Sequence, residues 1–361
     1  LVEIFKINAK KEGYELSSEA EALLLKKVEE MLTTKDKNFG NAGEMFKLFN
    51  EAKERQADRL AEVEGELTDQ QLFTLEAADI PYTPPKKVDL QECMRELDQL
   101  VGLASVKNAV RELADTLLVE QERARADGRQ ASINLDHYLF LGNPGTGKTT
   151  VARIMGNIFY SLGLLPSNKV VEVTTKDLIA PYVGQTAPKT EQMINRALGG
   201  IFFIDEAYGL NDGANGFGKD AMPVLWTKLL DYKGRMVSIA AGYPREMQQW
   251  IDTNSGLESR YTRKIYFEDY TADELAQIFR NMVSSNKLKL DDAADKEMLD
   301  YFRNLVAEDR PNFANAREAR NYFDRVKLNQ GRRLRGLMAL PNFDQQELYC
   351  LRAEDMIVRD I

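Results

Sequence analysis

One octapeptide, at residues 142–149, constrains the fold of this chain more than any other segment. It reads Gly-Asn-Pro-Gly-Thr-Gly-Lys-Thr and matches the phosphate-binding pattern G-x-x-x-x-G-K-[ST] in full. Its glycines let the backbone curl so that N–H groups face a phosphate, and the helix that follows adds a positive dipole. Such a loop stands between a buried strand and a helix, so the motif predicts an α/β fold.

The pattern around this loop predicts a doubly wound parallel sheet. Short apolar runs predict strands at 137–141, 170–174, 200–204 and 236–241, with helical patterns between them. The two ends of the chain instead show only helical spacing, and prolines 81, 84 and 85 mark a linker. We therefore expect a helical domain at 1–80, an α/β core at 81–275 and a helical domain at 276–361.

The two helical ends repeat each other. Phe5 and Phe279 are 274 positions apart, and so are Phe39 and Phe313. Without a gap, Asn41-Ala42 matches Asn315-Ala316, and further identities follow at 44, 49, 56, 59 and 60; the tail at 69–71 resembles 344–346. Such a match over more than fifty residues exceeds what shared helical periodicity explains. The N-terminal segment is therefore predicted to be a second copy of the C-terminal helical domain.

A pair of acids completes the chemistry that the phosphate loop begins. Asp205 and Glu206 follow the apolar run at 201–204, the usual end of a buried strand. Lys148 is predicted to reach the β- and γ-phosphates of ATP, while Thr149 and Asp205 hold Mg²⁺. Glu206 is the predicted general base that polarises the attacking water. ATP and Mg²⁺ are thus the expected ligands.

Five segments together resemble the CbbX/CfxQ family of AAA+ proteins, which includes the red-type Rubisco activase and has sporulation and type VII secretion ATPases as relatives. The segments lie at 100–103 (LVGL), 142–150, 182–190 (YVGQTAPKT), 199–208 and 241–243. The resemblance implies an AAA+ P-loop core with a parallel sheet and a helical lid after it. The repeat adds a lid-like domain before it.

The resemblance assigns further residues to the nucleotide. Val101 and Gly102 match the segment that lines the adenine pocket. Arg317, in the motif Asn315-Ala316-Arg317, matches the lid arginine called sensor 2, which contacts the γ-phosphate. The expected nucleotide-binding set is Val101, Gly102, Asn143, Pro144, Gly145, Thr146, Gly147, Lys148, Thr149, Thr150 and Arg317. The position of the polar sensor after the fourth strand stays open, with Tyr243 nearby.

The resemblance also implies assembly. Tyr182-Val183-Gly184 matches the pore loop with which AAA+ rings grip a substrate chain, and a second pore loop or a plain surface loop is open for 209–219. Arg260 matches the arginine finger, which acts on the neighbouring subunit's γ-phosphate. Glu258 stands where the family has a basic residue, and Arg263 is a spare candidate. A homo-oligomer, by resemblance a hexamer, is the expected form.

The first copy of the repeat departs at one telling position. Gly43 stands where the second copy has Arg317, and a glycine has no side chain to contact a phosphate. The sequence starts with Leu1, so we expect a fragment of a tandem protein whose upstream module is a weak or inactive ATPase. A nucleotide-gated scaffold or regulatory subunit with little ATPase activity is the alternative function, and the presence of Glu206 argues against it.

Composition excludes other classes. The net charge of −9 argues against a DNA-directed motor, which needs a basic footprint. No apolar run approaches the 18 or more residues of a membrane span, and no signal peptide is visible, so a cytoplasmic protein is expected. The predicted function is an ATP-hydrolysing motor that remodels a protein client. Rubisco, a secretion or sporulation component, and another assembly stay open as that client.

Overall fold

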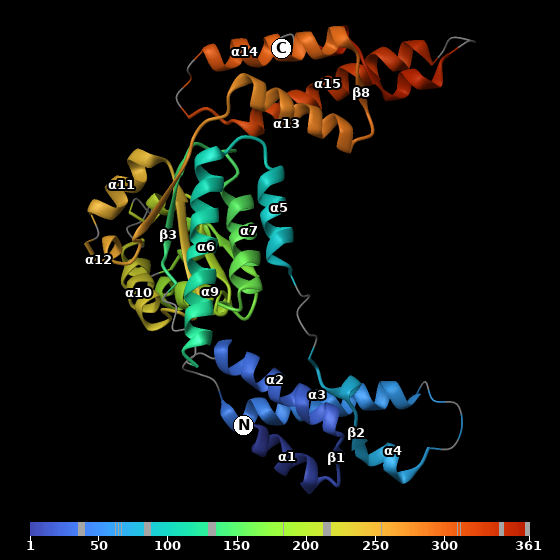
Figure 1. The fold of residues 1–361 in the computed structure, drawn as a ribbon, viewed down its shortest axis with the longest axis vertical. Helices are drawn as coiled ribbons and strands as arrows, with labels where there is room; N and C mark the ends of the chain where they lie inside the picture. The colour runs from blue at the N-terminus through green and yellow to red at the C-terminus, as the bar shows by residue number, and fades with distance from the viewer. Residues whose placement is uncertain are drawn as a thin grey trace.

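A parallel sheet of five strands lies at the centre of the chain, between two helical domains (Figure 1). The computed structural model describes residues 1–34, 40–61, 63, 65, 67–82, 88–128, 135–182, 184–211, 218–253, 255–308, 310, 312–338 and 343–357. Within this part of the chain, no helix combines the length and apolar character needed to cross a membrane.

The strand order is β4-β5-β6-β3-β7, and every neighbouring pair runs parallel. The strands are β3 Tyr138–Gly142, β4 Val170–Val173, β5 Ile201–Ile204, β6 Val237–Gly242 and β7 Arg263–Phe267. Four of them confirm the sequence prediction, whereas β7 was missed. It is an edge strand in which Ile265 and Phe267 are buried while the residues between and before them are exposed, so it lacks a continuous apolar run.

Helices cover both faces of the sheet, because successive side chains of a strand point to opposite sides. Phe140 and Phe203 pack in one apolar cluster, and their neighbours Leu139 and Phe202 pack in another. The first face carries α5 Leu90–Gln99, α6 Ala104–Ala126 and α7 Lys148–Ser161. The second carries α9 Thr186–Arg196, α10 Gly218–Asp231 and α11 Pro244–Asp252. Shorter elements are α8 Thr175–Leu178, η2 Ala207–Leu210 and α12 Ser255–Glu258.

The C-terminal helical domain stands on the carboxyl end of this core. It consists of α13 Ala272–Ser285, β8 Lys289–Leu290, α14 Asp292–Ala307, α15 Ala316–Leu337, η3 Gln345–Tyr349, β9 Cys350–Leu351 and η4 Ala353–Met356. Thr271 starts α13 with a capping box to Glu274, which satisfies the first free N–H groups of the helix. The apolar interior of this domain is continuous with that of the α5–α7 face.

The N-terminal helical domain has an apolar core of its own. It consists of α1 Val2–Lys11, β1 Glu15–Leu16, α2 Ser18–Thr34, α3 Asn41–Ala61, α4 Asp69–Phe73, β2 Thr74–Leu75 and η1 Ala77–Asp79. Its central aromatic contact repeats that of the C-terminal domain. The rings of Phe5 and Phe49 lie 5.5 Å apart at 85°, and those of Phe279 and Phe323 lie 5.5 Å apart at 80°.

The polar contacts repeat as well. Arg59 pairs with buried Asp79, as Arg333 pairs with buried Asp355. Each domain also contains a two-stranded parallel ladder, β1 with β2 and β8 with β9. The ladders correct the predicted match of the tails, because β1 and β8 start 274 positions apart but β2 and β9 start 276 apart. The resemblance of 69–71 to 344–346 is therefore out of register by one residue.

Candidate active site

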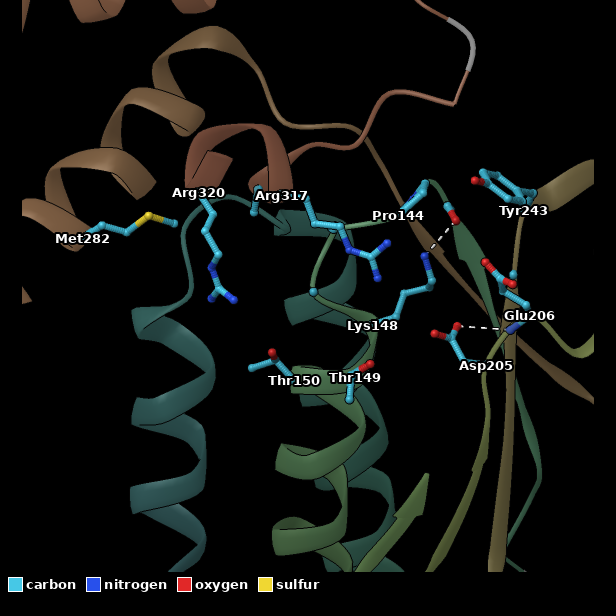
Figure 2. A pocket seen from close by; sticks show the side chains of 15 residues that line it. Pro144, Lys148, Thr149, Thr150, Asp205, Glu206, Tyr243, Met282, Arg317 and Arg320 are labelled. Atoms are coloured by element: carbon cyan, nitrogen blue, oxygen red, sulfur yellow. Dashed lines mark hydrogen bonds between the residues drawn. The ribbon is translucent and has the colours of Figure 1, made fainter. Parts of the chain in front are cut away.

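A cavity of about 370 Å³ opens between the core and the C-terminal helical domain. It lies where the carboxyl ends of β3, β5 and β6 meet, which is the usual binding edge of an open parallel sheet. The lining comes from the phosphate loop, from both acids of the predicted pair, and from α13 and α15 (Figure 2). Its residues are Gly142, Pro144, Gly145, Gly147, Lys148, Thr149, Thr150, Asp205, Glu206, Gly242, Tyr243, Met282, Ala316, Arg317 and Arg320.

The phosphate loop joins β3 to α7 as predicted, and its glycines are structurally required. Gly145 and Gly147 have φ of +73° and +93°, in the region that favours glycine. A Cβ on Gly145 would lie 2.2 Å from the carbonyl oxygen of Ala314, so the loop and the helical domain touch backbone to backbone. Asn143 and Thr146 hold the loop rather than line the cavity, since the Thr146 hydroxyl donates to the Asn143 carbonyl at 2.8 Å.

Lys148 is the first residue of α7 and is 9% exposed. Its ammonium donates to the carbonyl oxygens of Gly142 and Asn143 at 2.8 and 2.7 Å. Burial lowers the pKa of Lys148 to about 8, and the charge of Asp205 opposes part of that shift. The lysine is thus a desolvated cation at the centre of the cavity, where a phosphate would gain most from it.

The two acids directly follow β5 and face the loop from across the cavity. The backbone N–H of Glu206 donates to Oδ1 of Asp205 at 3.1 Å, which fixes the carboxylate of Asp205 (Figure 2). Glu206 has φ 51° and ψ 46°, a left-handed conformation that a non-glycine residue adopts at some cost. Carboxylates, the hydroxyl of Thr149 and the nearby lysine together fit a phosphate that carries a divalent cation.

The helical domain contributes two arginines from the first turns of α15. Arg317 and Arg320 both line the cavity and both point into it (Figure 2). Sequence reasoning found Arg317 and missed Arg320. The signal was present, because residues three apart on a helix share one face and Arg320 follows Arg317 at that spacing. With Lys148, these arginines give the cavity three cations against the two acids.

Family comparisons agree with this geometry. The family profile described as "ATPase family associated with various cellular activities (AAA)" matches residues 138–269, and the AAA lid domain profile matches twice, at 1–89 and at 271–360. CbbX of Cereibacter sphaeroides is 36% identical over 76% of this chain and 91% of its own length. The chain belongs to the CbbX/CfxQ family of AAA+ ATPases. ATP is therefore its nucleotide, and hydrolysis of ATP its reaction.

Other relatives of this CbbX/CfxQ-family ATPase carry different names. The chloroplastic ribulose bisphosphate carboxylase/oxygenase activase of Cyanidioschyzon merolae is 37% identical over 75% of this chain and 92% of its own length. Stage V sporulation protein K of Bacillus subtilis is 34% identical over 75% and 84%. Among solved structures, the AAA domain of FIGL-1 matches with a TM-score of 0.51 and 15% identity over 76% of this chain and 83% of its own, which shows the fold alone.

Tyr243, near the position that the sequence left open for the polar sensor, lines the cavity directly after β6. Its ring lies 6.0 Å from that of Tyr208. Burial raises the pKa of the Tyr243 phenol, and the carboxylate of Glu206 adds to the rise. The phenol therefore stays protonated at neutral pH, and it offers the site a hydrogen-bond donor close to Glu206.

Several residues of the family pattern are not among the residues that line the cavity. Val101 and Gly102 are not among the lining residues, and Gly102 packs against the carboxylate of Glu274 on α13. In the predicted pore loop, Tyr182 is 68% exposed, Gly184 has φ +77°, and Val183 lies outside the described residues. Most of the second candidate loop, 212–217, also lies outside them.

The predicted arginine finger does not reach the chain's own cavity. The guanidinium of Arg260 donates to the carbonyl oxygens of Trp226, at 3.1 Å, and of Gly256. Arg263, the spare candidate, starts β7 and pairs with Asp136 at 3.0 Å.

Proposed function

We propose that this ATPase works as a ring, by family resemblance a hexamer, and that it uses ATP hydrolysis to pull on a protein client. The observation that best supports this proposal is that Arg260 does not line the cavity of its own chain. The γ-phosphate whose charge Arg260 is expected to neutralise would therefore be bound in the cavity of another copy. The exposed Tyr182, two residues before Gly184, supports a client-gripping loop, because an exposed aromatic ring can bind a passing chain without reading its sequence.

The geometry of the lining residues supports the following roles within one site. Lys148 binds the β- and γ-phosphates, and Glu206 orients the attacking water and takes its proton. The hydroxyl of Thr149 and the carboxylate of Asp205 would hold Mg²⁺, and the bound ion would supply positive charge next to the phosphates. Arg317 contacts the γ-phosphate from the helical domain, so that domain can respond to whether ATP or ADP is bound.

Mixing two inactive variants tests the ring. Glu206→Gln removes the base but leaves Arg260, whereas Arg260→Ala removes the finger but leaves Glu206. If the finger acts in trans, mixed assemblies contain sites with the intact Glu206 of one subunit and the intact Arg260 of the next. Mixing should then restore ATP turnover that neither variant shows alone. Turnover in the mixture equal to the average of the two variants would contradict assembly through Arg260.

The gripping loop is tested by Tyr182→Ala against Tyr266→Ala. Both tyrosines are exposed, at 68% and 55%, and Tyr266 lies on the edge strand β7. Both variants should hydrolyse ATP at the basal rate. Only Tyr182→Ala should lose the acceleration of ATP turnover by an unfolded polypeptide such as casein, and equal stimulation of all three proteins would contradict the role of the loop.

We also propose that the N-terminal helical domain is the lid of a preceding module and does not sense nucleotide. Three residues that line the cavity in the second copy are Met282, Arg317 and Arg320. The first copy replaces them with Asn8, Gly43 and Phe46, so both arginines are absent there. Phe46 is 51% exposed, which suits contact with protein better than contact with phosphate. We further propose that the protein works in the cytoplasm. Rubisco is one candidate for its client.

A further inference from the structure

Asn315 stands out in the backbone of the lid. It immediately precedes α15 with φ 51° and ψ −122°, a conformation that costs any residue with a side chain and that glycine adopts freely. It is nevertheless an asparagine, and it is completely buried. A strained residue persists where the surrounding contacts over-determine it, so the contacts of its side chain should explain it.

The side-chain amide of Asn315 bonds to three different parts of the site. Its Oδ1 accepts from the backbone N–H of Tyr270 at 2.8 Å. Its Nδ2 donates to Oδ1 of Asp269 at 2.7 Å, to the carbonyl of Phe313 at 3.0 Å and, more weakly, to that of Pro144 at 3.4 Å. These partners lie in the segment that joins core to lid, in the lid itself and in the phosphate loop.

Asp269, in the segment that joins core to lid, bonds to both the phosphate loop and the lid. Its two carboxylate oxygens accept from Nδ2 of Asn143, at 3.0 and 2.8 Å, while one of them also accepts from Asn315. One carboxylate therefore holds one amide from the phosphate loop and another from the lid. Charge-assisted bonds of this kind are the stronger ones in proteins.

The backbone completes the connection. The N–H of Ala316, next to Asn315, donates to the carbonyl of Gly145 at 3.2 Å, and Gly145 leaves no room for a side chain against Ala314. Arg317 follows one residue later and reaches into the cavity. The direction in which α15 leaves the phosphate loop, and with it the position of Arg317, is thus set at Asn315.

We propose that Asn315 and Asp269 form a latch that fixes the lid on the phosphate loop and positions Arg317 for ATP hydrolysis. Both are positioning residues, because they act through Arg317 and do not line the cavity themselves. The proposal rests on the contact of Arg317 with the nucleotide proposed above. Glycine at 315 would relieve the backbone but would remove every bond of the amide, and aspartate would place a second carboxylate against Asp269.

Asn315→Gly tests the latch, because glycine accepts the native backbone and the variant should fold. We expect kcat to fall by about 10- to 100-fold, since a misplacement of about 1 Å in a reacting group can cost that much. KM for ATP should change less, because the phosphate loop and Lys148 remain. The matched control is Asn312→Gly, in the same lid loop, exposed and also at positive φ, at 62°. It should keep kcat within about twofold.

A double-mutant cycle with Arg317→Ala separates positioning from mere stability. If the latch acts through Arg317, Asn315→Gly should lower kcat in the native background but have no further effect once Arg317 is gone. Additive losses would overturn the latch, and so would a native kcat in Asn315→Gly. Full turnover in the Arg317→Ala single variant would show that the proposed role of Arg317 itself is wrong. Reduced turnover in Arg317→Ala together with native turnover in Asn315→Gly would show that only the latch is wrong. Thermal unfolding of each variant confirms that the comparison is made on folded protein.

Discussion

Removing the same arginine from each lid tests which lid serves the ATP site. In the C-terminal lid, Arg333 donates to Asp355 from Nε and Nη2, both at 3.0 Å, and to Glu347 from Nη1 at 2.9 Å. In the N-terminal lid, Arg59 donates to both carboxylate oxygens of Asp79 at 2.8 Å. The two carboxylates are 1% and 0% exposed. Each arginine–aspartate pair joins the long third helix of its lid, α3 or α15, to the 3-10 helix that ends the lid, η1 or η4.

The size of the effect follows from burial. Truncating either arginine leaves a carboxylate without its partner in a dry interior, and such losses cost about 3–5 kcal/mol. The side chain of Arg59 is 30% exposed and that of Arg333 only 10%, so water can replace Arg59 more easily and its loss should lie at the low end. Because the free energy of unfolding of a whole domain is only about 5–15 kcal/mol, either substitution should make local unfolding of its lid much more frequent.

The assay is ATP turnover together with hydrogen exchange over the two lids. Arg59→Ala and Arg333→Ala should each raise exchange in their own lid. Only Arg333→Ala should lower turnover, because its lid alone carries Arg317 into the cavity. Equal losses of turnover in both variants would refute the assignment of the N-terminal lid, and faster exchange in the C-terminal lid at unchanged turnover would refute the role of that lid.

Three further predictions concern the cavity itself. ATP affinity should fall as the pH rises above about 8, by up to about tenfold per unit, because Lys148 then loses the charge that binds phosphate; a flat binding profile between about pH 7 and 9.5 would contradict this, and Lys148→Met should show one. Arg320→Ala should weaken ADP binding by about 10- to 100-fold, the worth of a charge-assisted bond, while Arg325→Ala, exposed on the same helix, should not; equal affinities would remove Arg320 from the site. Glu206→Gln should keep ATP binding but lower turnover by about 10²- to 10⁴-fold, as loss of a general base does, and a single-turnover measurement would show any chemistry that remains.

The sequence predicted those parts of the site whose geometry is contained in a short segment. The phosphate loop carries its own turn, its glycines and the start of α7, so residues 142–149 are sufficient to place Lys148. Asp205 and Glu206 were placed by the strand before them, since a buried strand delivers the residue after it to the sheet's carboxyl edge. The lid repeat was also visible, because its register is free of gaps for more than fifty residues.

The parts that sequence reasoning missed depend on long-range contacts. Nothing near Asn315 in the sequence shows that its amide meets Asp269, which is 46 residues away, or Pro144, which is 171 away. The edge strand β7 was missed for a related reason, because only its place beside β3 makes Arg263 and Lys264 strand residues. Finding Arg320 required one further step of reasoning, which was to ask which residues share with Arg317 the face of α15 that lies toward the cavity.

The two lids of this chain share one fold, but only the C-terminal lid lines the cavity. Several positions that hold the lid together agree: Phe5 with Phe279, Phe49 with Phe323, and the buried arginine–aspartate pair. Four lid positions line the cavity, of which Ala316 matches Ala42, whereas Met282, Arg317 and Arg320 are replaced by Asn8, Gly43 and Phe46. If both cavity arginines were a by-product of the lid fold, they would recur in the first copy as the buried arginine–aspartate pair does. Their absence from the first lid supports the proposal that contact with phosphate is a separate requirement on the second lid.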